Sequence, residues 1–202
     1  MTVLEGLGAG VAALLTVNFA LNLRSSELKT AYRALRTIRG WRALGAVLQA
    51  AAVLFMVVAL GLSLIAVWPH VMGFSWLRLL ATPAEAPAAG GHPIPRLPGG
   101  AGVRLGFLVA VVGNVPRLAK NEERAFRQGH RKLGPVLWQS VKFGLAHCLV
   151  GVPVGIGLAM TISGLWMAWP YMRGGVRRAT AYHAVHNWFV LAIGALWMAG
   201  WI

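Results

Sequence analysis

Two adjacent glutamates are the residues of this chain best suited to acid–base chemistry. Five of the 202 residues are acidic, and two of these, Glu122 and Glu123, are neighbours in a predicted helix. Successive residues point about 100° apart on a helix, so Glu123 can pair with Arg127 one turn later while Glu122 stays free. Partial desolvation raises the pKa of a carboxyl group and suits it to take a proton from water. The alternative interpretation is a surface charge cluster at the lipid headgroups.

Two other apolar segments contribute histidines and an amide. Phe143 and His147 share a helix face at a spacing of four residues, and we expect His147 in the middle of a membrane span. His183 and Asn187 share a face in the same way, with His186 close beside them. Polar side chains at such positions must face protein or a cavity. Each histidine could instead form a hydrogen bond between helices, the role that we favour for His186.

A free carboxylate, two histidines and an amide on three helices are the parts needed to cleave an amide bond. Glu122 could activate water, and His147 could hold that water or shuttle a proton. His183 and Asn187 could donate hydrogen bonds to the oxyanion of a tetrahedral intermediate. Loss of one such donor costs about 3 kcal/mol.

The same residues form three motifs in a fixed order along the chain. Glu122–Arg127 has the form EExxxR, Phe143–His147 the form FxxxH, and His183–Asn187 the form HxxxN. In this order and on successive helices, the motifs resemble those of the CAAX prenyl protease and bacteriocin-processing (CPBP, Abi-type) intramembrane proteases. The resemblance covers residues 103–202 and implies a protease that acts on membrane-associated or lipid-modified substrates.

The resemblance also implies a role for each motif residue. It makes Glu122 the general base, assisted by His147, and makes His183 and Asn187 the oxyanion site. It implies that the site is supported by Glu123, Arg127 and Phe143. This chain departs from the family pattern in two ways. The glycine that usually follows the motif arginine comes one residue later, at Gly129. With about six expected spans the chain is also shorter than many relatives, so a partner or a dimer could complete the cavity.

One alternative cofactor for the protease and two alternative functions would use some of these residues differently. Glu122, His147 and His183 could bind zinc, but asparagine is a poor zinc ligand and there is no HExxH pair, so we expect no metal. A haem electron carrier would use His147 with His183 or His186 as axial ligands. A non-catalytic membrane scaffold or immunity-type protein would keep the motifs for packing alone.

Composition indicates a membrane protein. The chain is 57% hydrophobic and 12% charged, with a formal net charge of +14. Its basic residues fall in short clusters between apolar stretches, as in cytoplasmic loops, so nucleic-acid binding is not expected. The single cysteine, Cys148, excludes an intramolecular disulfide.

The pattern of apolar stretches predicts an all-α bundle of about six membrane helices, since each span needs about 20 apolar residues. Residues 1–68 form an N-terminal pair of spans with a basic loop, and residues 69–102 form an external region rich in proline and glycine from residue 82 onward. Residues 103–202 form a four-helix catalytic core, with a bend expected at Pro116. The expected spans are residues 3–23, 43–68, 103 to about 116, 134–151, 154–172 and 179–202.

The basic clusters set the expected orientation in the cell membrane. Segments 24–42, 117–132 and 173–178 are predicted to be cytoplasmic, with both termini outside. The expected partners are the lipid bilayer and a membrane-embedded or lipid-anchored peptide, with a homo-oligomer as a further possibility. Lys142, next to the FxxxH motif, is expected to reach the interface, pair with an acid or contact a substrate carboxylate.

Overall fold

A computed structural model describes residues 3–75 and 101–198, and in these residues every regular element is a helix. The predicted all-α class is confirmed, whereas most of the predicted external loop, residues 76–100, lies outside the described residues. The elements are α1 (Val3–Asn22), α2 (Ser26–Ala34), η1 (Leu35–Thr37), α3 (Trp41–Val67), α4 (Pro69–Met72), α6 (Ala101–Arg127), α7 (Leu133–Ala146), η3 (His147–Val150), α8 (Val154–Ala159) and α9 (Thr161–Met198).

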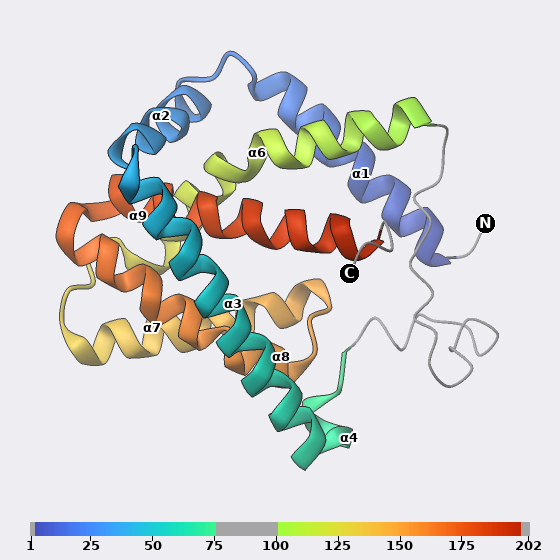
Figure 1. Cartoon of the computed structure of the whole chain (residues 1–202). Coiled ribbons are helices and arrows are strands. Elements are labelled where there is room, and N and C mark those ends of the chain that lie inside the picture. Colours follow the sequence, from blue (N-terminus) through green and yellow to red (C-terminus); the bar gives the residue numbers. More distant parts are fainter. Residues whose placement is uncertain (1–2, 76–100, 199–202) are drawn as a thin grey trace.

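Helix α9 consists of two arms that meet at a glycine pair. Gly174 and Gly175 have non-helical backbone angles, and the φ of +63° at Gly175 is one that glycine adopts without a steric penalty. The arms, residues 161–173 and 176–198, run in different directions and are drawn in orange and red in Figure 1. The basic segment predicted to join two spans is therefore a sharp bend in the chain. The span predicted over 154–172 is also divided, because α8 ends before Met160.

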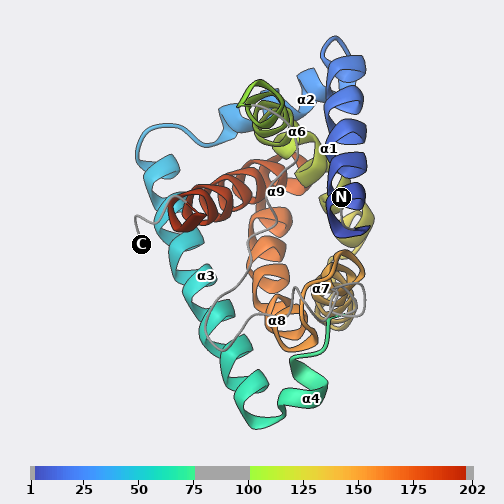
Figure 2. The same cartoon turned by 90° about the vertical axis from the view of Figure 1, so that its right-hand side faces the viewer.

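The two arms of α9 occupy the middle of the molecule. In Figure 2 the first arm runs between α3 on one side and α7 on the other, and both helices contact α9. Helices α6, α7 and the second arm of α9 lie lengthwise in Figure 1, whereas α6 and α7 are seen nearly end-on in Figure 2. Helices α1 and α3 cross this group. The three helices that carry the motifs are thus in contact with one another.

Helix α6 continues through Pro116. Side chains from α2 and α9 donate hydrogen bonds to the two carbonyl groups near the proline. Proline has no N–H, so the carbonyl of Val112 loses its partner within the helix. The indole Nε1 of Trp188 on α9 donates to this oxygen at 3.0 Å. The hydroxyl of Tyr32 on α2 donates to the adjacent carbonyl of Gly113, also at 3.0 Å. These bonds connect α6 to α2 and to α9 at the position where its own ladder is interrupted.

One described helix, α3, is long and apolar enough to cross a membrane by length and composition. It has 27 residues, only 22% of its most apolar window is buried, and Phe55 is 75% exposed. Helix α7 has 14 residues, fewer than the roughly 20 that a span requires. The structure therefore supports a possible membrane helix in α3, and the bundle of six spans stays a prediction.

Small residues let the backbone of α7 come close to the backbones of α8 and α9. A Cβ atom on Gly144 would collide with the carbonyl oxygen of Gly157 and lie 2.9 Å from the nitrogen of Thr161. A Cβ atom on Gly164 would lie 2.9 Å from the Cα atom of Ser140. Close backbone approach at small residues is typical of helix packing in membranes. It holds the FxxxH helix against α9.

We expect Gly144→Ala to lower the free energy of unfolding by about 1–3 kcal/mol, because the added methyl group meets backbone atoms that cannot rotate away. Gly134→Ala on the same helix is the matched control, since no atom lies within 4 Å of its added Cβ. Thermal unfolding of both variants in detergent would compare them. Equal midpoints for the two variants would contradict this account of the interface.

Candidate active site

A fully buried carboxylate, that of Glu123, is the centre of the site. Its Oε1 atom accepts a hydrogen bond from Nη1 of Arg127 at 2.9 Å and one from Nδ1 of His183 at 2.8 Å. Arg127 also donates through Nη2 to the carbonyl of Gly164 at 3.1 Å. The ion pair expected between Glu123 and Arg127 is present, and it connects α6 to both arms of α9.

Glu122 faces the other nitrogen of the same imidazole. Its Oε2 atom lies 3.3 Å from Nε2 of His183, and its side chain is 34% exposed while that of His183 is 1% exposed. The contact lacks hydrogen-bond geometry, and this buried oxygen has no hydrogen-bond partner among the described residues. His183 therefore lies between two carboxylates from consecutive residues of α6. This geometry was not predicted, because the sequence pattern paired Glu123 with Arg127 alone.

The tautomer of His183 follows from its partners. Glu123 is paired with Arg127 and accepts hydrogen bonds as a carboxylate, so Nδ1 of His183 carries a proton. Nε2 then either holds the lone pair of a neutral imidazole or bears the second proton of an imidazolium. The contact between Nε2 and Glu122 can thus hold one proton at either end.

Phe143 brings the FxxxH motif into this cluster. Its buried ring meets the rings of His147 and His183 edge to face, at centroid distances of 4.8 and 5.6 Å. The guanidinium of Arg127 lies over the same ring, 4.9 Å from its centroid. Phe143 therefore contacts residues from all three motif segments.

His147 lies directly after the last residue of α7 rather than in the middle of a helix, and its position in the middle of a membrane span stays a prediction. Helix α7 ends at Ala146, and His147 begins the short 3-10 helix η3, which stops at Gly151 with a φ of +91°. Nδ1 of His147 lies 2.8 Å from the carbonyl oxygen of Phe143. A carbonyl only accepts, so Nδ1 is the donor and the lone pair of the neutral ring is on Nε2.

His186 and Asn187, the other two polar residues of the segment His183–Asn187, lie about one turn after His183 on α9. His186 is buried and tilted against Trp166 at a centroid distance of 5.6 Å, and its Nδ1 atom has no hydrogen-bond partner in the described residues. Asn187 is half-buried and follows His183 by one turn. No hydrogen bond joins its amide to another side chain in the described part of the chain.

Lys142 points away from the cluster. Its side chain is exposed, with Nζ 5.7 Å from the ring centroid of Trp138 on the same helix. A lysine against an exposed tryptophan is typical of the membrane interface.

The geometry does not support the alternative zinc site or a haem ligated by His183. Within residues 3–75 and 101–198, no three His, Cys, Asp or Glu side chains form a group that could hold a metal ion, which includes the set Glu122, His147 and His183. Both ring nitrogens of His183 face glutamate oxygens, which leaves none to coordinate haem iron.

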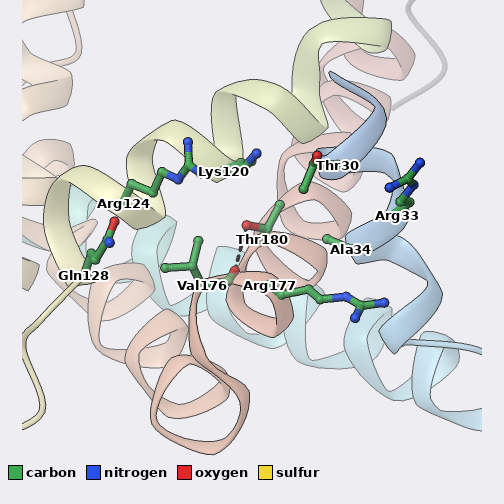
Figure 3. A pocket seen from close by; sticks show the side chains of 9 residues that line it. All are labelled: Thr30, Arg33, Ala34, Lys120, Arg124, Gln128, Val176, Arg177 and Thr180. Atoms are coloured by element: carbon green, nitrogen blue, oxygen red, sulfur yellow. Dashed lines mark hydrogen bonds between the residues drawn. The ribbon is translucent and has the colours of Figure 1, made fainter. Parts of the chain in front are cut away.

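A second feature was not predicted as a site at all. A cavity of about 460 Å³ lies between α2, α6 and the second arm of α9, and is lined by Lys120 and Arg124 on α6 (Figure 3). Glu122 does not line it. Arg117, Lys120 and Arg124 recur every three or four residues, which places them on one face of α6. That spacing was the available signal, but the cluster was interpreted only as a marker of orientation.

Comparison of the chain with protein-family models, with curated proteins and with solved structures gives no match. The motifs and the geometry of the cluster are therefore the features that bear on function.

We expect Glu123→Gln to lower the free energy of unfolding by about 3–5 kcal/mol, because it leaves the buried Arg127 without a counter-charge. Glu122→Gln is the matched control, with the same chemical change at the neighbouring, partly exposed position. Its expected cost is below about 1 kcal/mol. Denaturation followed by tryptophan fluorescence would measure both, and similar losses for the two variants would contradict the central role of Glu123.

Proposed function

We propose that this protein is an intramembrane endopeptidase that hydrolyses peptide bonds with water activated by Glu122. The observation that carries the proposal is the position of His183, whose imidazole lies between the carboxylates of Glu123 and Glu122 at 2.8 and 3.3 Å. A buried histidine oriented by one carboxylate and facing a second, partly exposed one is an arrangement suited to proton transfer.

The mechanism that we propose has a defined starting state. The opposite charges of Glu123 and Arg127 compensate each other. The mechanism starts with Glu122 as a carboxylate and with a proton on Nε2 of His183. In this state Glu122 can accept a proton, and Nε2 of His183 has a proton to donate.

The reaction follows from these two properties. Glu122 takes a proton from water while the water oxygen bonds to the carbonyl carbon of the scissile peptide. The carbonyl oxygen becomes an oxyanion, to which Nε2 of His183 and the amide of Asn187 donate hydrogen bonds. When the carbon–nitrogen bond breaks, Glu122 returns its proton to the leaving amine.

His147 has a geometry suited to holding the water. Its Nδ1–H donates to the carbonyl of Phe143 at 2.8 Å, so Nε2 is available to accept a hydrogen bond from a water proton. The edge-to-face contacts of Phe143 with both imidazoles place the two histidines beside one ring. No metal is needed in this scheme.

We further propose that the chain is a multi-pass protein of the cell membrane with about six spans and resembles the CPBP proteases in activity. Exposed apolar side chains on α3 support contact with lipid. The segments 24–42, 117–132 and 173–178 converge at one cavity, which supports a common, cytoplasmic side for all three. The substrates would then be membrane-embedded or lipid-anchored peptides, cleaved near that face.

We expect Glu122→Ala, His147→Ala and His183→Ala each to lower the cleavage rate by at least about 100-fold, since each removes a proton-transfer or positioning group. His186→Ala is the matched histidine control and should keep activity, because His186 faces Trp166 rather than the glutamates. Substrates would be found by comparing new peptide termini in cells that express the wild type or Glu122→Gln. The rates would then be measured on those peptides in proteoliposomes.

The Glu122→Gln variant distinguishes this proposal from a non-catalytic scaffold. A catalytic role predicts a folded, inactive protein that retains uncleaved membrane peptides when it is purified. Full cleavage by Glu122→Ala, or unchanged peptide termini in cells, would reject the proposed mechanism.

A further inference from the structure

The basic cavity gathers residues from three distant segments of the chain. Figure 3 shows Arg33 from α2 on one side, Lys120 and Arg124 from α6 on another, and Arg177 from the second arm of α9. The cavity measures about 460 Å³, within the range of small-molecule binding sites. Thr180 and Ala34 are buried in its wall, at 1% and 2% exposure. The site is therefore a concave pocket with a closed floor.

One carboxylate faces this group of four cations. Glu27 accepts from Nζ of Lys120 at 2.6 Å and from Nη1 of Arg124 at 3.2 Å. The hydrogen bond from Lys120, together with the lysine charge, lowers the pKa of Glu27, so it is ionised at neutral pH. Among the described residues no acid forms an ion pair with Arg33 or Arg177. The pocket therefore keeps an excess of positive charge at its rim.

We propose that this pocket binds the phosphate group of a ligand, either the headgroup of an anionic lipid or a free phosphate compound. Like charges gathered around a cavity create a field that concentrates anions. Arginine presents planar donors that match phosphate oxygens, and the rim arginines Arg33 and Arg177 are exposed and without acidic partners. Basic pockets between helices at the cytoplasmic surface are typical sites for anionic headgroups.

The phosphate site is separate from the proposed peptidase site. Lys120 and Arg124 point to one side of α6. Glu122 points to the opposite side, because successive residues of a helix turn by about 100°. The inference therefore does not depend on proteolysis. Its tests use binding alone, so failure of one proposal leaves the other unaffected.

Purified protein in neutral detergent would be titrated calorimetrically with three probes: inorganic phosphate, short-chain phosphatidic acid and short-chain phosphatidylcholine. We expect phosphatidic acid or inorganic phosphate to bind, and phosphatidylcholine to bind at least about tenfold more weakly because its choline carries a positive charge. If inorganic phosphate binds, a free phosphate compound is sufficient to fill the site. If phosphatidic acid binds and inorganic phosphate does not, the ligand is a lipid headgroup. Equal binding of phosphatidylcholine, or no binding of any probe, would overturn the proposal.

The double variant Arg33→Gln/Arg177→Gln should weaken binding by about tenfold or more, the factor that corresponds to 1.4 kcal/mol. Arg36→Gln/Arg173→Gln is the matched control, since it removes the same charge from the same two segments outside the pocket. Arg173 does not line the pocket; its Cζ atom lies 4.4 Å from the ring centroid of Trp169. If both double variants lost the same binding affinity, the effect would come from net charge alone, and the proposed site would be refuted.

Glu27→Gln provides a test with the opposite sign. It removes the internal anion that competes for Lys120 and Arg124, so we expect binding to strengthen by about threefold to tenfold. A variant that merely disturbed the fold would not bind more tightly. Weaker binding by a folded Glu27→Gln protein would count against the proposal.

Discussion

A buried carboxylate has to be paired, and the pairing of Glu123 organises the rest of this structure. Its oxygen receives one hydrogen bond from Arg127 on its own helix and one from His183 on α9. Arg127 in turn reaches the carbonyl of Gly164 in the first arm of α9. The two arms are consequently connected to α6 through one ion pair, on either side of the bend at the glycine pair.

The catalytic proposal follows from what this pairing does to His183. Because Nδ1 is held by Glu123, the imidazole cannot rotate, and Nε2 is directed toward Glu122. Phe143 closes the cluster on the side of α7 and carries His147 into it. Glu123 thus stabilises the fold and also orients His183, the residue that we propose transfers protons. Glu122 is partly exposed and lies outside the ion pair that connects α6 to α9.

The two flanks of α6 differ in charge and in shape. On one flank the Oε2 atom of Glu122, which has no hydrogen-bond partner among the described residues, faces His183. On the other flank Lys120 and Arg124 share the carboxylate of Glu27. The flank with the cations borders a cavity that extends to Arg33 and Arg177. Helix α6 therefore presents an acidic site and a basic site from residues that are adjacent in sequence, since each step along the helix turns the side chain by about 100°.

Local relationships were predictable from the sequence, and long-range ones were not. The helical class, the pair between Glu123 and Arg127 and the closeness of Phe143 and His147 follow from local spacings along the chain, where helical geometry is nearly constant. The contact of His183 with both glutamates spans 60 residues of chain, and no spacing rule relates such positions. The end of α7 at Ala146 and the cavity formed by three basic segments likewise depend on packing. Close backbone contacts at Gly144 and hydrogen bonds to the carbonyls around Pro116 set the relative positions of the helices, so only the tertiary structure determined which polar groups meet.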